Sequence, residues 1–309
     1  MNQSPSVERL LIVGVGLIGG SIARAARANA LAEHIALIDR DPDVVARAAA
    51  LGLGDQIEGE ASDLRGTFDL CVVATPMGAI GPAAAGLGDV LAEGAILTDV
   101  GSVKGGAYDA LAQVGRADVA IIPGHPIAGT EQSGPEAGFA HLFAERWWVL
   151  TPAPDTDAQA LTRLSAFITG LGAKVETMDP GHHDLVLAIT SHVPHLIAYN
   201  IVGTAADLET VTASEVIKYS AGGFRDFTRI AASDPVMWRD IFLTNKEAVL
   251  EMLGRFSEDL IALQRAIRWG DGDALHALFT RTRAIRRSVI EAGQDTAEAD
   301  FGRGHERTR

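Results

Sequence analysis

The stretch GVGLIG (14–19) decides the fold, because it joins an apolar run to a helical pattern. LLIV (10–13) directly precedes it and SIARAARANAL (21–31) follows it. A glycine turn between a strand and a helix is typical of dinucleotide-binding folds: Gly14 permits the tight turn, Gly16 lets the backbone approach a pyrophosphate, and Gly19 allows close packing of helix on strand. The sequence therefore predicts that phosphates bind where the helix begins, at Leu17 and Ile18.

An acidic residue at the end of the next apolar run strengthens this interpretation. HIALID (34–39) ends at Asp39, twenty residues after Gly19, where a carboxylate accepts hydrogen bonds from the adenosine ribose. A carboxylate repels the 2′-phosphate of NADP, so Asp39 favours NAD as the cofactor. The neighbouring Arg40 could pair with such a phosphate, which leaves NADP open. A glycine turn with a purely structural role is the less favoured alternative.

Two styles of hydrophobic pattern divide the chain. As far as Met178, short apolar runs alternate with amphipathic stretches, which predicts an α/β fold with a doubly wound, mainly parallel sheet of the Rossmann type. The expected strands are LLIVGVG, HIALIDR, DLCVVATP, AILTDVGS, VAIIPGHP, WWVLTP and AKVETM. From Asp179 onward helical patterns replace them. We predict a dinucleotide-binding domain over 1–178, an all-helical domain over 179–295 and a disordered tail over 296–309.

Polar residues follow several of these strands at their carboxyl ends, where a doubly wound sheet binds its ligand. Thr75 and Pro76 follow DLCVVA, and Asp99 to Ser102 follow AILT, so we expect both groups to border a nicotinamide. Ser102 could orient a catalytic group by a hydrogen bond. It could also be the N-cap of the helix expected after DVGSVKGG, since serine is a favoured cap residue.

His125, in GHPIAGTEQSG (124–134), reaches the same edge after the run VAIIP. An imidazole with an ordinary pKa of about 6.5 is mostly neutral near pH 7, and it can accept a proton from a substrate hydroxyl while a hydride leaves the same carbon. The alternative is a loop histidine that binds a backbone carbonyl. Beside a nicotinamide site, the catalytic interpretation is favoured.

Composition limits the possible partners. The chain has 309 residues and a formal net charge of −14, which argues against nucleic acid and anionic membranes, because both are bound through basic patches. The N-terminal MNQSPSVERL lacks the pattern of a secretion signal, so we expect a cytoplasmic protein.

The segment 185–206 carries no Asp, Glu, Lys or Arg and is long enough to cross a bilayer. Its histidines, Pro194 and Asn200 would be costly at a membrane centre, so we interpret it as a buried helix.

A metal site has to be weighed at the same segment. His192 and His195 are three residues apart and would share a helix face. No third ligand with convincing spacing is visible in the sequence, and hydrogen-bonded histidines in a packed helix are commoner. We therefore predict no metal.

Five motifs together resemble a known family. GVGLIGGS, TDVGSVK, GHPIAGTEQSGPEAG, SHVPH and GGFRDFTRIAASDPVMWRDI occur in the order and spacing of the prephenate/arogenate (cyclohexadienyl) dehydrogenases of tyrosine biosynthesis, from about Leu10 to Ala292. The resemblance implies NAD-dependent oxidation of the ring carbon that carries the hydroxyl, with loss of the ring carboxylate as CO₂ and aromatisation. It also implies a homodimer formed through the helical domain. The choice between prephenate and arogenate stays open.

The resemblance also assigns roles to single residues. His125 matches the family's base, and Ser102 matches the serine that orients it and touches the same hydroxyl. Arg229 matches an arginine that binds a substrate carboxylate, which a guanidinium can hold bidentately. Asp184 and Glu131 match acids that tune access to the site or pair with that arginine. The residues expected to bind substrate are thus His195, Arg229, Ser191, Arg225 and Glu131.

Two other functions stay open from the residues alone. A β-hydroxy-acid dehydrogenase of the same architecture would use a lysine of the helical half, where Lys218 and Lys246 are the candidates. A protein that senses NAD without chemistry would need only the nucleotide site. The combination of His125 with Ser102 and Arg229 exceeds what sensing requires.

Overall fold

The structure is a computed structural model that describes residues 7–130, 132–207 and 221–291. By their contacts the residues group into two units, Met1–His192 with Ser233–Lys246, and Val193–Ala232 with Glu247–Arg309. The first unit therefore extends past Met178, the boundary expected from the sequence pattern, and includes residues 179–192. The expected tail at 296–309 lies outside the described residues.

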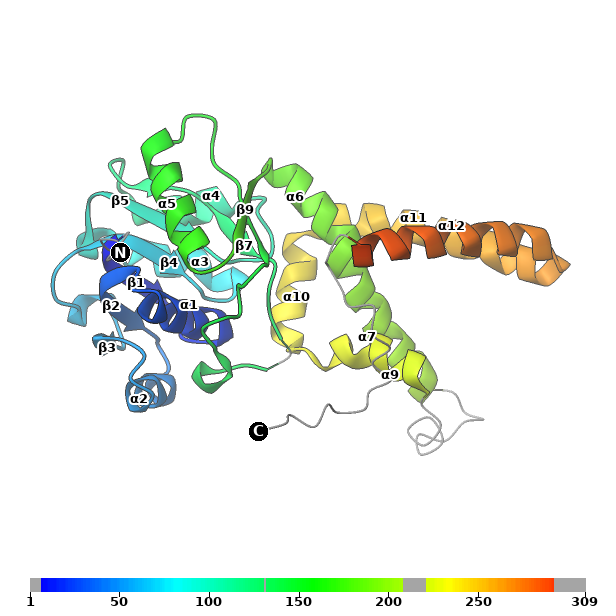
Figure 1. Ribbon diagram of the computed structural model, residues 1–309, viewed down its shortest axis with the longest axis horizontal. Coiled ribbons are helices and arrows are strands. Elements are labelled where there is room, and N and C mark those ends of the chain that lie inside the picture. The colour runs from blue at the N-terminus through cyan, green and yellow to red at the C-terminus, as the bar shows by residue number, and fades with distance from the viewer. Residues whose placement is uncertain (1–6, 131, 208–220, 292–309) are drawn as a thin grey trace. The chain divides into compact units, whose positions relative to one another are not determined.

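Six parallel strands form the main sheet of the first unit, in the order β3-β2-β1-β4-β5-β6 (Figure 1). This is the strand order of a Rossmann-type fold, and it confirms the predicted fold class. The order reverses between β1 and β4, so the carboxyl ends of these two strands flank the place where such folds bind ligands. The strands are β1 Val7–Val13, β2 Ala32–Ile38, β3 Gln56–Glu58, β4 Phe68–Val73, β5 Leu91–Asp99 and β6 Ala120–Ile121.

Alternating side chains of the central strands build two apolar cores, one on each face of the sheet. Leu10 and Ile12 of β1 belong to one core, and Leu11 and Val13 belong to the other. A strand buried on both faces gives an unbroken apolar run, which is why LLIV indicated a parallel sheet. Residues of α1 and α5 join the first core and residues of α3 and α4 join the second. The helices are α1 Leu17–Ala28, α2 Pro42–Ala50, α3 Ile80–Ala85, α4 Ala107–Leu111 and α5 Ala158–Gly170.

A proline divides the expected strand VAIIPGHP (119–126) in two. Pro123 has no N–H group to donate to a strand ladder, and the chain leaves the main sheet there. It then enters a second sheet, in which β7 (Gly124–Pro126) pairs antiparallel with β8 (Trp147–Leu150), and β8 pairs parallel with β9 (Lys174–Thr177). The runs expected in one sheet thus form two, and His125 lies on the smaller.

Every regular element described after residue 179 is helical, as the sequence pattern predicted. α6 (Pro180–Leu187) continues through the π-turn η6 (Ala188–His192) into α7 (Val193–Ala206). Pro194 has no N–H group for a regular helical bond, and the wider turn just before it accommodates that loss. α10 (Pro235–Thr244) belongs to the first unit. The other α-helices within the described residues are α9 Gly222–Thr228, α11 Lys246–Trp269 and α12 Gly272–Glu291.

Among the described residues, one helical stretch, Pro180–Ala206, is long and apolar enough to cross a membrane by length and composition, with a mean hydropathy of 1.5. Its second turn carries His183 and Asp184, which are buried and form polar contacts with each other and with the loop after β5. These contacts hold the start of the helix in the first unit, but only 28% of the apolar window is buried in the single chain, so the buried helix expected from the sequence is found only in part.

Candidate active site

The glycine turn has the geometry that each glycine was expected to provide. Gly14 has a φ of 95°, and a Cβ there would lie 2.6 Å from the carbonyl oxygen of Ala74, so only glycine fits between β1 and β4. A Cβ on Gly19 would collide with the backbone of Gly14. A Cβ on Gly16 would meet nothing within 4 Å. The space beside Gly16 is therefore open to a ligand.

The N-terminus of α1 faces that turn without a side-chain cap. Gly16 is its N-cap residue, and Leu17 and Ile18 form its first turn. The first N–H groups of a helix have no partner within the helix and carry a partial positive charge, so they bind phosphate well.

Asp39 directly follows β2, beside the glycine turn. Its Oδ2 accepts the N–H of Val15 at 2.8 Å, and its Oδ1 accepts the N–H of Asp41 at 3.0 Å. These bonds fix the carboxylate, and each oxygen keeps a lone pair for a ribose hydroxyl. Arg40 is exposed.

Thr75 follows β4 at the same edge of the sheet. Its Oγ1 is buried and has no hydrogen-bond partner among the described residues, although buried hydroxyl groups are normally paired. Pro76 follows it and begins the short turn η2 (Met77–Ala79). An orphaned hydroxyl at the carboxyl edge of the sheet indicates a place where a ligand completes the hydrogen bonding.

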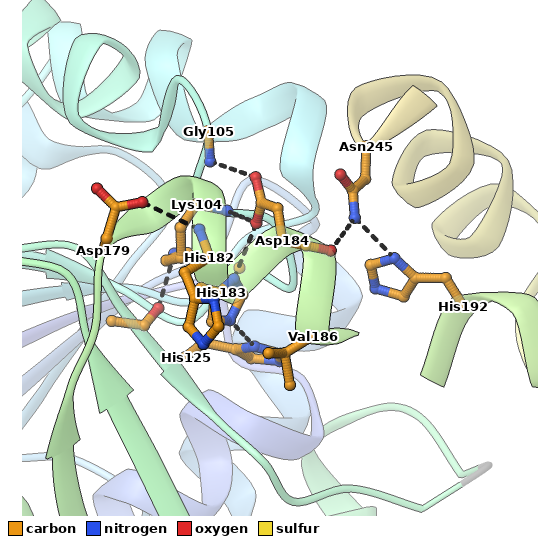
Figure 2. Close-up of polar contacts among 12 residues, drawn as sticks. Lys104, Gly105, His125, Asp179, His182, His183, Asp184, Val186, His192 and Asn245 are labelled. Atoms are coloured by element: carbon orange, nitrogen blue, oxygen red, sulfur yellow. Dashed lines mark hydrogen bonds and ion pairs between the residues drawn. The ribbon is translucent and has the colours of Figure 1, made fainter. Parts of the chain in front are cut away.

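His125 lies in the middle of β7 and is 8% exposed. Its Nδ1 is 2.9 Å from Nε2 of His183, and Nδ1 of His183 is 2.8 Å from Oδ1 of Asp184 (Figure 2). His183 is fully buried. The three side chains form one hydrogen-bonded chain, which we call the Asp184–His183–His125 chain.

The start of α6 brings two members of this chain into place. Asp179 is the N-cap and accepts the N–H of His182 at 3.0 Å, and Pro180 occupies the first turn. The buried residues of the helix are His183, Asp184 and Leu187. The histidine and the aspartate therefore lie on the side of the helix that packs inward.

Asp184 is held as a carboxylate. Its Oδ1 accepts the N–H of Lys104 and its Oδ2 accepts the N–H of Gly105, both at 2.7 Å. Burial alone would raise the pKa of Asp184, but the hydrogen bonds from His183 and from the two backbone N–H groups outweigh it and keep the pKa below its ordinary value. Asn245, at the end of α10, donates to the backbone oxygen of Asp184 at 2.9 Å.

A buried ion pair holds the residue that precedes His125. Nζ of Lys104 lies 2.5 Å from Oδ2 of Asp99 and donates to the backbone oxygen of Gly124 at 2.7 Å. Oδ1 of Asp99 accepts the N–H of Gly124 at 3.1 Å. The backbone N–H and the carbonyl oxygen of Gly124 are therefore both hydrogen-bonded to this ion pair, whose side chains are 0% exposed. This arrangement fixes the backbone from which His125 projects.

These contacts determine which nitrogen of His125 can act as a base. A carboxylate only accepts hydrogen bonds, so Nδ1 of His183 must donate to Asp184. With a single ring proton on His183, its Nε2 is bare, and Nδ1 of His125 must be the donor of the hydrogen bond between the two rings. Nε2 of His125 is left without a proton. Burial above all, and then His183, Lys104 and His192, hold the pKa of His125 well below its ordinary value, so the ring is neutral.

Some of the residues expected from the sequence are not joined to His125. Ser102 is half-buried after β5, and it does not cap α4, because the N-cap is Gly106. The expectation that Asp184 pairs with an arginine differs from its described partners, which are His183 and backbone N–H groups. Glu131 lies outside the described residues.

The other expected substrate residues are spread over both units. Ser191 is in η6 of the first unit. His195 in α7, Arg225 in α9 and Arg229 in the turn η7 (Arg229–Ala232) belong to the second unit, and α7 contacts both α9 and η7. The second unit thus places the histidine and the two arginines on neighbouring elements.

Among the described residues, no group of three or more His, Cys, Asp and Glu could hold a metal ion. His192, one of the two histidines weighed as ligands, is buried with its Nδ1 3.1 Å from Nδ2 of Asn245, and its ring meets Trp238 edge-on.

Three contributors to the site were missed by sequence reasoning: His183, Lys104 and Asn245. Lys104 ends the motif TDVGSVK but was given no role in the sequence analysis, although a lysine is almost never fully buried unless paired. A signal for His183 was present, because GHHD begins a helix with two polar residues on the face that Leu187 marks as buried. Asn245 carried no signal, since its role depends on contacts across sixty-one positions of the chain.

Two family models cover most of the chain. The model described as "Prephenate dehydrogenase, nucleotide-binding domain" matches residues 22–177, and "Prephenate dehydrogenase, dimerization domain" matches residues 179–281. The chain belongs to the prephenate dehydrogenase family. This confirms the family resemblance seen in the five motifs, and the two models meet at the end of β9.

Relatives within the family cover nearly the whole chain. A cyclohexadienyl dehydrogenase of Zymomonas mobilis is 40% identical over 90% of this chain and 95% of its own length. A prephenate dehydrogenase of Bacillus subtilis is 33% identical over 93% of this chain and 76% of its own. The crystal structure of an A. aeolicus prephenate dehydrogenase in complex with hydroxyphenyl propionate and NAD+ has a TM-score of 0.85 and 35% identity, over 93% of this chain and 100% of that one.

Proposed function

We propose that this member of the prephenate dehydrogenase family is an NAD-dependent enzyme that oxidises prephenate, arogenate or both. The products would be CO₂ and 4-hydroxyphenylpyruvate or tyrosine. The observation that carries the proposal is the Asp184–His183–His125 chain, because it ends in a neutral imidazole on a unit that also holds a nucleotide-binding turn. Relatives named cyclohexadienyl and prephenate dehydrogenase support the same reaction.

The residues around the glycine turn fit a bound NAD. The space beside Gly16 is open, α1 has no side-chain cap, and the hydroxyl of Thr75 is buried without a partner in the described part of the chain. The pyrophosphate would bind at Leu17 and Ile18, and Asp39 would accept the ribose hydroxyls, which favours NAD over NADP. When bound, NAD supplies the acceptor for a hydride.

We expect Gly16→Ala to weaken NAD binding by about tenfold or more, which corresponds to about 1.4 kcal/mol. The added methyl group meets no protein atom within 4 Å, so the fold should be unaffected while the space needed by the pyrophosphate is filled. Calorimetric titration with NAD and thermal unfolding measure the two effects. Gly59→Ala is the matched control, because a Cβ there also meets nothing. Equal NAD affinity in both variants would place the pyrophosphate elsewhere.

His125 is the proposed base, acting through its bare Nε2. It takes the proton of the substrate hydroxyl while the hydrogen on the same carbon leaves as hydride. The bond to the ring carboxylate then breaks, CO₂ departs, and the electron pair of that bond makes the ring aromatic and places negative charge on the oxygen. The oxygen regains the proton from His125. The imidazole therefore stores a proton during the reaction and releases none to solvent.

The other residues expected from the sequence are proposed to bind the rest of the substrate. Arg229 and Arg225 are exposed near α7, which carries His195, and a guanidinium gives an acidic protein a focused site for a carboxylate. Ser102 is proposed to touch the substrate hydroxyl. Ser191 and Glu131 complete the proposed set.

We also propose a cytoplasmic homodimer formed through the helical part of the chain. In the single chain α11 and α12 expose large apolar side chains, among them Ile267, Trp269 and Phe279, and only 28% of the apolar window in Pro180–Ala206 is buried. Exposed apolar surface of this extent is typical of an interface, and the family model matched there is described as a dimerization domain. We also propose the domain division expected from the sequence, with a dinucleotide-binding domain that ends at Met178 and a helical domain that follows it.

The test is NAD reduction by the purified protein, followed by absorbance, with prephenate and arogenate offered in parallel and with NAD and NADP each tried. CO₂ is measured alongside. We expect one CO₂ for each NADH, whereas a β-hydroxy-acid dehydrogenase that stops at the keto acid would release none. Tight NAD binding without turnover of any such compound would support the sensing function instead. No reduction with either cyclohexadienyl substrate would overturn the proposal.

A further inference from the structure

We propose that His183 takes up the proton that His125 accepts, and that Asp184 stabilises the charge this creates. The inference rests on the proposed function, because it concerns where the hydroxyl proton is kept between its removal and its return. His183 is thereby a positioning residue that acts through His125, and the chain in Figure 2 is the path of the proton.

The surroundings of His125 are unfavourable for an imidazolium. The ring is buried, and the ionisable groups that influence it are His183 from α6, Lys104 from the loop after β5 and His192 from η6, none of which is an anion. Asp99, the acid nearest to Lys104, is already engaged by its Nζ at 2.5 Å. A proton that stayed on His125 would therefore place a second positive charge next to a buried lysine.

A short transfer removes that charge from His125. When Nε2 of His125 forms a bond to the incoming proton, the N–H bond at Nδ1 can break and a new N–H bond can form at Nε2 of His183, 2.9 Å away. His125 is neutral again and His183 is the imidazolium. The reverse movement returns the proton to the substrate oxygen, so no co-reactant is needed.

His183 is the better place for the charge because of Asp184. Nδ1 of His183 lies 2.8 Å from Oδ1 of Asp184, so a charge that arrives on His183 is met by a charge-assisted hydrogen bond to the carboxylate. The carboxylate cannot turn away, since the N–H groups of Lys104 and Gly105 each bind one of its oxygens. The start of α6 at Asp179 and the loop after β5 therefore keep Nδ1 of His183 and the carboxylate of Asp184 at hydrogen-bond distance.

Glutamine at position 183 separates proton uptake from simple orientation. In His183→Gln the amide oxygen can still accept the N–H of His125, so the ring keeps its tautomer, but the amide cannot take the proton. His183→Leu removes both properties. His182→Gln is the matched control, because His182 is the adjacent histidine, is exposed, and contributes only its backbone N–H to the described contacts.

We expect kcat of His183→Gln at neutral pH to fall by about tenfold or more, with KM and the unfolding temperature close to those of His182→Gln. The acid limb of the kcat profile should also shift, because a proton added to the intact enzyme is shared by the coupled pair, whereas in the variant only His125 can hold it. A kcat within twofold of the control, with an unmoved acid limb, would overturn the inference.

A second measurement does not depend on turnover. In the resting enzyme labelled with ¹⁵N-histidine, NMR should show Nδ1 protonated and Nε2 bare in both His125 and His183, with the signals assigned from the variants. A bare Nδ1 on His125 would contradict the proposed path even if His183→Gln failed to fold. If His183→Gln lost both its kcat and the tautomer of His125 with the proton on Nδ1, His183 would only orient the ring of His125 and would not take up the proton. An intact enzyme that reduces no NAD with either substrate would reject the proposed function, while the NMR result would still stand.

Discussion

His125→Asn is expected to lower kcat by roughly 10³-fold, within the range that a positioned general base contributes. Asparagine keeps a hydrogen-bonding group near the position of Nδ1, so it can still face His183, but it has no basic nitrogen where Nε2 of His125 lies. The substrate hydroxyl then loses its proton acceptor. Steady-state NADH formation gives kcat, and titration with NAD gives the cofactor affinity, which should be unchanged because the glycine turn is untouched.

His182→Asn provides the control for the loss of any histidine in this region, since it is exposed. It should retain the kcat of the unmodified enzyme. If His125→Asn kept more than a tenth of that rate, another group would have to be the base. Lys246, at the start of α11, would then be the next candidate.

Lys104→Met is expected to lower the free energy of unfolding by about 3–5 kcal/mol, the usual cost of removing one partner of a buried ion pair. The substitution leaves the carboxylate of Asp99 uncompensated with its side chain 0% exposed, and it leaves the backbone oxygen of Gly124 without its donor. Urea unfolding measures the change. We also expect a lower kcat, because Gly124 directly precedes His125.

Lys174→Met is the matched control, since Lys174 forms an ion pair with Glu145 whose side chains are 48% and 83% exposed. Exposed pairs contribute little, so the control should unfold close to the unmodified protein. The double variant Lys104→Met with Asp99→Asn should recover part of the lost stability, because no uncompensated charge remains. Equal effects of Lys104→Met and Lys174→Met would show that the buried pair is not a structural anchor.

The sequence predicted the fold well where the determinants are local. The order apolar run, glycine turn, helix at 10–31 depends on neighbouring residues, and the structure confirms it. The division of VAIIPGHP was missed, although Pro123 marked it, because the apolar run on one side and the motif on the other were treated as one strand. The local residue pattern therefore predicted where strands form, but it did not predict which strands pair with each other.

The site was predictable at its glycines and only partly elsewhere. The apolar run before His125 was recognised, but the residue lies on β7 of the smaller sheet and its partner His183 is fifty-eight residues away. The contacts of Asp184 with Lys104 and Gly105 span eighty and seventy-nine residues. Such contacts depend on how α6 packs, which no periodicity encodes. The contact among Lys104, Asp99 and Gly124 could not be predicted for the same reason, since each residue looks ordinary alone.

The chain of contacts from His125 to Asp184 crosses the seam at which the two family models meet, between residues 177 and 179. Recombining domains between relatives at that seam would transfer the imidazole with one parent and both of its partners with the other. A chimera would work only if the incoming helix start matched the resident loop after β5. The same holds for a fragment ending at 178, which would keep its nucleotide turn but lose the means to orient its base. Natural exchange at this boundary is therefore constrained by three side chains, however independent the two sequence modules look.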